Sequence, residues 1–307
     1  MINNPRILVV GSINMDLLLM TKRLPKPGET MFSQDYFFNP GGKGANQVVA
    51  ASLLGSSATF AGKVGNDNFA DILRNTLQDY GVNTSFLSAS EKNASGFAAI
   101  LLEESGQNRI IVHPAANQDL TKSDIDKAFT CDYDGMIIQF EIPVDIVIYA
   151  CKKAKEKGIP IAVDTGPAMD FPLEKLQGIE ILSPNETEAA HMCGFELRCH
   201  EDYKKAAQIL SERTCAKHIV LKLGEKGACI FTNGEINLIP AYNVKAVDAT
   251  AAGDVFTAAM IVEYLKSADI AAAVQYANAA GALTVTKAGA QQSIPTGSEV
   301  ARFIGSA

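Results

Sequence analysis

Residues 135–164 read GMIIQFEIPVDIVIYACKKAKEKGIPIAVD and contain a complete strand–helix–strand unit. The apolar runs at 135–140 and 159–163 predict two buried strands. Between them, residues 144–157 have apolar side chains at helical spacing, a lysine-rich last turn and Gly158 just beyond it, which is typical of a helix end. Strand–helix alternation of this kind predicts a parallel, doubly wound sheet with helices on both faces.

The same alternation extends in both directions along the chain. Strands are predicted at 6–10, 179–182 and 218–223, and a helix is predicted at 69–80. An Asn233-Gly234 turn predicts a hairpin between 228–232 and 235–239. Two alanine-rich helices follow, one ending near Lys266 and one from about 270 to 285. We therefore expect an α/β fold, a doubly wound, mostly parallel sheet flanked by helices, in one domain spanning residues 1–307.

Two strand-rich regions interrupt this rhythm, because no helix pattern separates their strands. They comprise residues 17–20 and 36–38 in the first region, and 96–102 and 109–113 in the second. We expect them to pair as one small β-sheet lid, inserted into the main domain at about 14–40 and 95–113. The exposed apolar and aromatic content of this lid makes it a candidate homodimer surface.

Bulk properties restrict the classes of partner. The chain has 307 residues, 47% apolar and 20% charged, with a net charge of −7, which argues against nucleic acid and anionic membrane surfaces as partners. No apolar run reaches the length of a membrane span, and the first residues lack a signal-peptide pattern, so we expect a cytoplasmic protein. The six cysteines are irregularly spaced. A zinc site at His191, Cys193, Cys199 and His200 is disfavoured because the spacings match no standard zinc pattern.

Polar side chains repeatedly follow the predicted strands. They are Asn14, Asp16, Glu141, Asp164, Asn185 and Glu188. Because ligands of open α/β sheets bind beyond the carboxyl ends of the strands, these residues predict a binding site. A simple turn is the alternative for Asn14 and Asp16. Asn185 and Glu188 lie three residues apart at the start of a helix, so both could reach a hydrated Mg²⁺, although a capping box explains the same spacing.

Two stretches of small residues complete the pattern. Residues 246–256 read AVDATAAGDVF, with small residues between Asp248 and Asp254 just before a helix. Such a helix start can bind an anion, and a carboxylate beside an anion hole suits phosphoryl transfer, but an Asp that caps the helix is the simpler alternative. The second stretch, 40–46, has three glycines and precedes a helix predicted at 47–54. Its spacing is not that of a P-loop, and a glycine hinge and a binding loop fit it equally.

Four motifs, in chain order, resemble the ribokinase/PfkB family of carbohydrate kinases, and its ribokinase branch in particular. They are Gly11 to Asp16, Gly41 to Asn46, Pro184 to Glu188 and Asp248 to Asp254. The resemblance implies transfer of the γ-phosphoryl group of ATP to the primary 5-hydroxyl of D-ribose, giving ribose 5-phosphate. Two alternatives stay open: a kinase for deoxyribose, a hexose or a nucleoside, and a non-catalytic sugar- or nucleotide-binding regulator. A dehydrogenase is disfavoured, since no Gly-x-Gly-x-x-Gly follows the first strand.

The resemblance also implies residue roles. Asp254 matches the catalytic base, and the backbone of Ala251, Ala252 and Gly253 matches the anion hole. The sugar positions are Asn14, Asp16, Gly42, Lys43, Asn46 and Glu141, together with Asp254. The nucleotide positions are Asn185, Lys222, Gly224, Gly227, Gly253 and Asn278, and Asn185 and Glu188 match the Mg²⁺ motif. An activating K⁺ would lie at Asp248, Thr250, Thr284, Lys287, Gly289 and Ser293, bound largely by backbone carbonyls.

The sequence departs from the family pattern at three places. Ala249 replaces a threonine, residues 164–167 read Asp-Thr-Gly-Pro in place of Asn-Pro-Ala-Pro, and Lys222 replaces a threonine. Because backbone N–H groups form the anion hole, we expect the replacement of threonine by Ala249 to alter its function little. Asp164 adds negative charge near the phosphates, which predicts a changed nucleotide or substrate preference.

Overall fold

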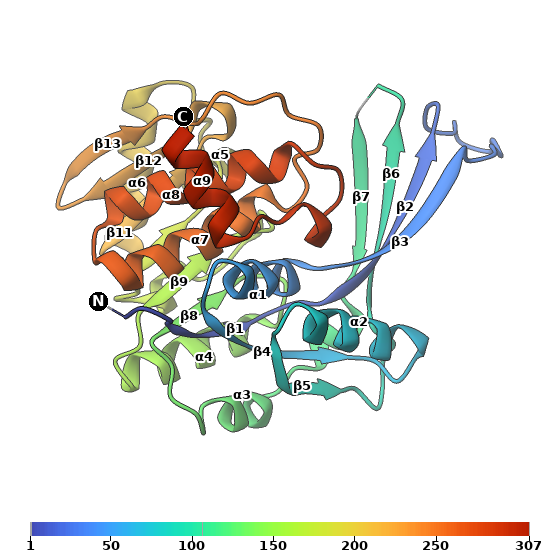
Figure 1. The fold of residues 1–307 in the computed structure, drawn as a ribbon, viewed down its shortest axis with the longest axis horizontal. Helices are drawn as coiled ribbons and strands as arrows, with labels where there is room; N and C mark the ends of the chain where they lie inside the picture. The colour runs from blue at the N-terminus through green and yellow to red at the C-terminus, as the bar shows by residue number, and fades with distance from the viewer. Residues whose placement is uncertain (1, 106, 307) are drawn as a thin grey trace.

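The computed structural model describes residues 2–105 and 107–306 and contains two sheets (Figure 1). The main sheet has nine strands in the order β13-β12-β11-β10-β9-β8-β1-β4-β5. Their bounds are β1 Arg6–Val10, β4 Ser57–Val64, β5 Asn83–Ala89, β8 Gly135–Ile138, β9 Ile161–Asp164, β10 Ile181–Ser183, β11 His218–Lys222, β12 Ala228–Thr232 and β13 Glu235–Ile239. The strands from β5 to β11 are parallel, and β12 and β13 are antiparallel. The predicted doubly wound, mostly parallel sheet is confirmed.

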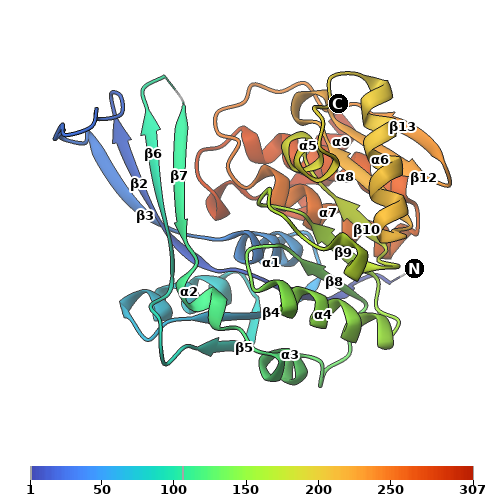
Figure 2. The same ribbon diagram turned by 180° about the vertical axis from the view of Figure 1, so that it is seen from behind.

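Helices cover both faces of this sheet. One face carries α1 Lys43–Leu53, α2 Asn68–Asp79, α7 Ala252–Ser267, α8 Ile270–Val285 and α9 Gly297–Ser306. The other face, turned toward the viewer in Figure 2, carries α3 Lys122–Ala128, α4 Val144–Glu156, α5 Glu186–Cys193 and α6 His200–Thr214. Alternate side chains of β1 enter the two cores, Ile7 and Val9 on one face and Leu8 and Val10 on the other.

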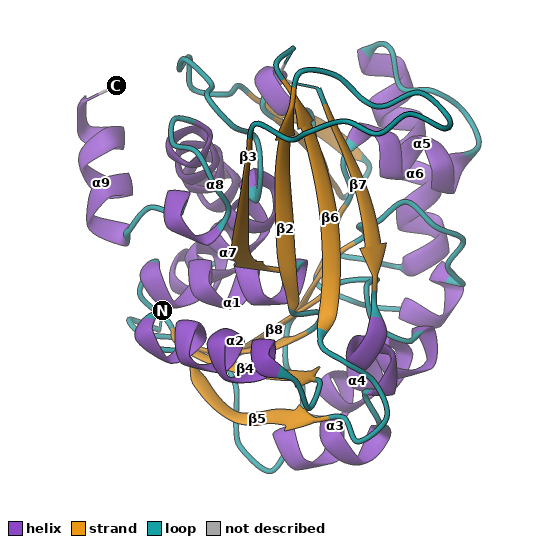
Figure 3. Cartoon of the chain, turned by 90° about the vertical axis from the view of Figure 1, so that its right-hand side faces the viewer, coloured by secondary structure: helices purple, strands orange, loops and turns teal. Residues whose placement is uncertain are grey.

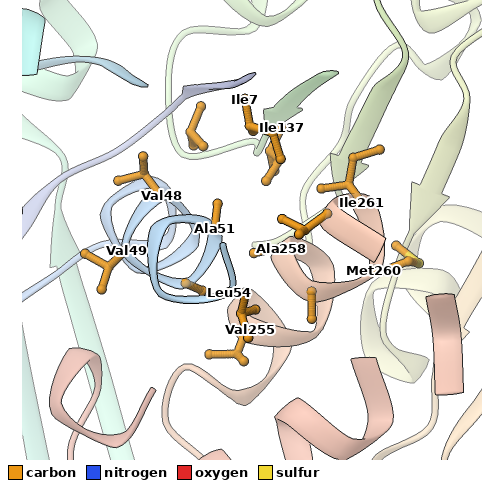
Figure 4. Packing of buried hydrophobic residues seen from close by; sticks show 14 of the residues in the cluster. Ile7, Val48, Val49, Ala51, Leu54, Ile137, Val255, Ala258, Met260 and Ile261 are labelled. Atoms are coloured by element: carbon orange, nitrogen blue, oxygen red, sulfur yellow. The ribbon is translucent and has the colours of Figure 1, made fainter. Parts of the chain in front are cut away.

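The helices α1 and α7, which carry the key site motifs, are packed together over the centre of the sheet. Figure 4 shows Ala51 of α1 facing Ala258 of α7, with Val48 of α1 on the left, Ile261 of α7 on the right, and Ile7 and Ile137 of the strands above them. Burial of this apolar surface holds the first turns of the two helices in a fixed relation, since core packing tolerates little displacement.

The glycine-rich stretch is the start of α1 itself, which corrects the predicted start at residue 47. Gly42 is the N-cap, with φ 90°, and the helix begins at Lys43. A Cβ on Gly44 would lie 2.7 Å from the Ser12 nitrogen, so only glycine lets α1 come this close to the end of β1. The predicted periodicity began later because the first turn contains small residues and no large apolar side chain.

The two strand-rich regions pair as one small second sheet, as predicted. Its strands are β2 Asn14–Thr21, β3 Asp35–Gly41, β6 Gly96–Glu103 and β7 Asn108–His113, in the order β3-β2-β6-β7. Figure 3 shows them side by side, and Figure 1 shows that they project from the main body. Several large apolar side chains on β3 and β7 are exposed, namely Tyr36, Phe37, Phe38, Ile110, Ile111 and Val112.

Among the described residues, no helix has both the length and the apolar character needed to cross a membrane.

Candidate active site

The carboxyl ends of the parallel strands bring the predicted polar residues to one edge of the main sheet. Asn14 and Asp16 lie on β2, just beyond the end of β1, and Glu141 follows β8. Asp164 ends β9, Asn185 follows β10, and a β-bridge joins Asn185 to Lys222 at the end of β11. The turn interpretation of Asn14 and Asp16 is wrong, because both lie on a regular strand that is hydrogen-bonded on both sides.

The first turn of α7 places Asp254 against α1. The N-cap of α7 is Ala251, in the left-handed region at φ 62°, and it makes no side-chain cap. The capping interpretation of Asp254 is therefore wrong. Its buried carboxylate instead accepts hydrogen bonds from the Asn46 amide at 2.9 Å and the Gln47 amide at 3.3 Å, with the Lys43 ammonium at 3.5 Å. The α1 motif and the α7 motif, more than 200 residues apart, form one site.

The environment of Asp254 increases its affinity for a proton. Burial raises the pKa of the Asp254 carboxyl, Lys43 opposes this effect, and the negative charge of Asp164 adds to it. A raised pKa makes a carboxylate a better general base, since proton transfer becomes more favourable as the pKa of the base approaches the working pH.

The helix start beside Asp254 has the backbone geometry of an anion site. The Ala252 N–H donates to the Ala249 carbonyl at 3.3 Å, whereas the Gly253 N–H has no backbone acceptor among the described residues. An unpaired N–H at the positive end of a helix attracts anions. The left-handed conformation of Ala251 is uncommon for a residue with a Cβ and turns the chain into this first turn.

The predicted sugar residues surround Asp254 on the side of the second sheet. The Asn14 side chain is fixed by a 2.8 Å hydrogen bond from Asn117. Gly41 leaves room for Asp16, because a Cβ there would lie 2.0 Å from Asp16 Oδ2. Glu141 accepts a hydrogen bond from the Ser12 hydroxyl at 2.5 Å and lies 3.4 Å from the Lys43 backbone nitrogen.

Two buried oxygens on this side have no protein donor among the described residues. They are Asp16 Oδ1 and Asn46 Oδ1. A buried acceptor without a donor costs free energy, so such groups persist where a ligand supplies the hydrogen bond. Burial, and then the charges of Glu141 and Asp254, raise the pKa of Asp16 to about 7. A hydroxyl-rich ligand would satisfy both oxygens.

We expect the free protein to lose stability as pH rises, because of Asp16. The folded-state pKa of about 7 lies above the ordinary value of 3.8, so the native state binds the extra proton between these limits. The free energy of unfolding should fall from about pH 4 to about pH 7, by at most about 1.4 kcal/mol per pH unit, and then level off. Denaturant unfolding of the wild type and of Asp16→Asn across this range measures the effect. Parallel curves for the two proteins would contradict it.

A cavity of about 820 Å³ opens on the other side of the α7 start. Every predicted nucleotide position lines it: Asn185, Lys222, Gly224, Gly227, Gly253 and Asn278. Lys43 and Glu188 also reach it, and the segment 241–244 with Gly281 and Ala282 forms further wall that the sequence did not indicate. The cavity therefore meets the predicted sugar residues at Lys43 and at the start of α7.

Two of these lining residues have structural roles of their own. Asn278 donates to the carbonyls of Ile239 and Pro240, each at 3.1 Å, and so fixes the segment that follows β13. A Cβ on Gly227 would lie 2.1 Å from the Ile239 carbonyl oxygen, so this position requires glycine for backbone packing. Both residues shape the cavity wall through the backbone of residues 239–241.

Asn185 and Glu188 form the capping box at the start of α5, which confirms that interpretation of their spacing. Asn185 accepts from the Glu188 N–H at 2.8 Å, and Glu188 accepts from the Asn185 N–H at 3.0 Å. The Thr165 hydroxyl also donates to Glu188, at 2.9 Å. Glu188 still borders the cavity. Among the described residues, no group of three or more His, Cys, Asp or Glu side chains could enclose a metal, the cluster from His191 to His200 included.

The predicted K⁺ residues are only partly brought together. Asp248 accepts from the Thr250 hydroxyl at 2.6 Å and from the Gly289 N–H at 2.9 Å, so these three residues are in contact. The remaining side chains point to other partners: Thr284 donates to the Ala280 carbonyl, Ser293 to the Ala290 carbonyl and Lys287 to Glu299. Any cation bound here would depend mainly on backbone carbonyls.

The sequence suggested that Asp164 adds net negative charge to the site, but two lysines neutralise that charge. The Lys222 ammonium lies 2.8 Å from its carboxylate, and the Lys43 ammonium lies 3.8 Å away. Burial would raise the pKa of Asp164, but Lys222 and Lys43 hold it well below its usual range. Asp164 and Lys222, two of the three departures from the family pattern, therefore form one ion pair.

Several residues that support the site were missed by sequence reasoning. Gln47 donates to both Asp164 and Asp254, Gln139 donates to Gln47, and the Thr257 hydroxyl donates to Asp164 at 3.0 Å. The only sequence signal was position, since Gln47 follows Asn46 and Gln139 lies two residues before Glu141. For Asn117, which fixes Asn14, the sequence held no signal.

The chain also matches the model of a known protein family. The model of the "pfkB family carbohydrate kinase" matches residues 4–297, which is nearly the whole chain.

The chain belongs to the pfkB family of carbohydrate kinases.

Among its pfkB relatives, ribokinase of Haemophilus influenzae is 33% identical over 298 residues, covering 96% of this chain and 97% of that protein. Deoxyribokinase of Salmonella typhimurium is also 33% identical, over 295 residues, covering 94% and 95%. The solved structure of Arabidopsis thaliana ribokinase complexed with ribose and ATP superposes with a TM-score of 0.89, at 31% identity, over 98% of this chain and 99% of that chain.

Proposed function

We propose that this pfkB kinase transfers the γ-phosphoryl group of ATP to the primary 5-hydroxyl of D-ribose, giving ribose 5-phosphate and ADP. One observation carries the proposal. The buried Asp254 carboxylate lies between two buried oxygens, Asp16 Oδ1 and Asn46 Oδ1, which have no donor among the described residues, and a cavity of about 820 Å³ that Gly253 lines. The ribokinase relatives, one of them solved with ribose and ATP, support this choice of substrates.

Each group of residues has a part in the reaction. Asp16, Asn14, Asn46 and Glu141, with the backbone at Gly42, bind and orient the sugar hydroxyls. Asp254 takes the proton of the attacking hydroxyl. The sugar oxygen then bonds to the γ-phosphorus as the bond to the β,γ-bridging oxygen breaks, and ADP leaves. The backbone N–H groups from the N-cap Ala251 to Gly253 stabilise the charge of the moving phosphoryl group, above all that of Gly253, which has no backbone acceptor among the described residues.

We propose that the cavity takes ATP together with Mg²⁺. Of the two carboxylates that line the cavity, Glu188 and Glu225, we assign Glu188 to the metal, because the Asn185 amide lies beside it, 2.9 Å from its carboxylate. A single carboxylate suits Mg²⁺, which keeps most of its waters and is held in part by the phosphates themselves. When bound, the metal neutralises phosphate charge. Since ATP is a substrate, we also propose a cytoplasmic location.

The test is an ADP-release assay with ATP, Mg²⁺ and a panel of D-ribose, 2-deoxy-D-ribose, hexoses and nucleosides. We expect D-ribose to have the highest kcat/KM. A preference for deoxyribose would replace ribose as the acceptor and keep the mechanism, since a deoxyribokinase is also among the relatives, at 33% identity. Tight sugar binding without ADP release for any acceptor would favour a non-catalytic regulator.

We propose that K⁺ activates the enzyme through the Asp248 loop. Because Asp248 joins Thr250 to Gly289, it fixes the loop that leads into Ala251 and the start of α7. We expect Asp248→Ala to lose the activation by K⁺ and to lower kcat by about tenfold, through a displaced anion hole. Assays in K⁺ and in a bulky organic cation measure it. Undiminished K⁺ activation in the variant would show that the K⁺ site does not lie at this loop.

We propose that the second sheet closes over the sugar as a lid and pairs with the sheet of a second copy to form a homodimer. Its strands carry apolar side chains that the described structure leaves exposed, Ile111 at 67% among them. Ile110→Asp combined with Ile111→Asp places charge on both faces of β7. We expect this variant to shift the protein from dimer to monomer in sedimentation analysis, and an unchanged dimer would contradict the proposal.

A further inference from the structure

Asp164 and Lys222 form a buried ion pair between the sheet and the cavity. Lys222 Nζ lies 2.8 Å from Asp164 Oδ2, with 0% of the Asp164 side chain and 10% of the Lys222 side chain exposed. Three further groups fix the carboxylate: the Thr257 hydroxyl at 3.0 Å, the Gly166 N–H at 3.0 Å and the Gln47 amide at 3.3 Å. Asp164 is therefore a rigid, ionised anchor.

Lys222 extends from this anchor to the cavity. It lines the cavity together with Gly253, and its Nζ lies 3.9 Å from the point where a Cβ on Gly253 would be. An ammonium has three N–H donors. Among the described residues, Asp164 is the one hydrogen-bond acceptor of Lys222 Nζ. The ammonium can therefore donate to an anion at the start of α7 without leaving Asp164.

The second lysine shows how Asp164 divides the positive charge. Lys43 Nζ lies 3.5 Å from Asp254 Oδ1 and 3.8 Å from Asp164 Oδ1. Burial alone would lower the pKa of Lys43, but the carboxylates of Asp164 and Asp254 raise it well above its usual value. Both lysines line the cavity, but Asp164 shares Lys43 with Asp254, whereas Lys222 pairs with Asp164 alone among the described residues.

We propose that Lys222 binds the distal phosphates of ATP and stabilises the transferring phosphoryl group, and that Asp164 is the positioning residue that holds it there. The inference rests on the kinase function proposed above and assigns it a charged side chain beside the backbone anion hole. A fixed ammonium lowers the barrier because it is already oriented toward the negative charge of the transferring phosphoryl group. No reorganisation of the site is then needed during the reaction. The alternative is a purely structural ion pair, of the kind that two neutral residues can replace.

A double-mutant cycle of Lys222→Thr and Asp164→Asn separates these two roles. We expect Lys222→Thr to lower kcat about 10- to 100-fold and to weaken ATP binding about tenfold, with AMP binding within about twofold of wild type. Asp164→Asn should change the same quantities in the same direction. The double variant should regain thermal stability, because no buried charge is left unpaired, but should keep the low kcat and the reduced ATP-over-AMP preference.

A double variant with wild-type kcat and wild-type ATP-over-AMP preference would overturn the proposal, because the pair would then be structural only. Lys222→Arg is expected to retain the preference for ATP, and loss of that preference would equally contradict a role for the charge. Lys217→Thr is the matched control, since Lys217 precedes the opposite end of β11 and pairs with Glu180 at 2.7 Å, far from the cavity. It should leave kcat unchanged.

The nucleotide measurements need no sugar, so they also separate this proposal from the function on which it rests. If the wild type bound ATP and phosphorylated no sugar, the kinase proposal would fail. The proposed role of Lys222 would then be judged from the binding data alone. An equal preference for ATP over AMP in the wild type and in Lys222→Thr would overturn that role.

Discussion

Asp254→Asn is expected to lower kcat by about 10³- to 10⁴-fold while D-ribose still binds, the largest effect of any single substitution in this kinase. An amide cannot take the proton of the attacking hydroxyl. It can still accept the hydrogen bond that Asn46 donates at 2.9 Å, so the local geometry should survive. Single-turnover kinetics measure the chemical step, and calorimetry measures the binding of ribose.

Asp269→Ala is the matched control for this variant. Asp269 is also an acid at the start of a helix, but it is the N-cap of α8 and accepts from the N–H groups of Ala271 and Ala272. Its loss should lower stability by about 1 kcal/mol and leave kcat unchanged. If Asp254→Asn behaved like Asp269→Ala, with lower stability and normal turnover, Asp254 would be a structural residue and the mechanism would be wrong.

Asp16→Ala is expected to reduce kcat/KM for D-ribose by about 100-fold, with the KM for ATP unchanged. Asp16 Oδ1 is buried without a donor in the described structure, and a hydrogen bond from a sugar hydroxyl to a charged acceptor contributes about 1.5–3 kcal/mol. Steady-state kinetics with each substrate varied in turn measure the two effects separately. Because Asp16 lies on β2 and outside the ATP cavity, its loss should affect the sugar alone.

The free-protein stability of Asp16 variants gives an independent check on the same residue. Burial and the charges of Glu141 and Asp254 destabilise the ionised Asp16, so Asp16→Asn should be more stable than the wild type at pH 8, where Asp16 is charged. Higher stability combined with weaker sugar binding identifies a group held in a strained state for a ligand. Lower stability and unchanged ribose kinetics would show that Asp16 serves the fold.

Local patterns predicted much of the fold because local chemistry determines it. The hairpin of β12 and β13 around Asn233-Gly234 and the helix α8 have the predicted bounds, since turn residues and apolar periodicity act over a few positions. The elements β4, β5, α3, α6 and α9 lie where no prediction was made. In α6, charged and polar side chains on the exposed face obscured a narrow apolar stripe that includes Tyr203, Ala206 and Leu210.

By itself, the sequence determined the strand–helix alternation, the second sheet and the set of polar residues beyond the strand ends. Which of these groups meet was decided by the tertiary structure. The contact of Asn46 with Asp254 spans 208 residues, and that of Lys222 with Asp164 spans 58. The strand order and the packing of α1 against α7 bring these groups within hydrogen-bond distance, and neither leaves a local pattern. Only the folded chain turns two apparent departures from the family pattern into one ion pair beside the start of α7, because a buried charge is stable only where another part of the chain supplies its partner.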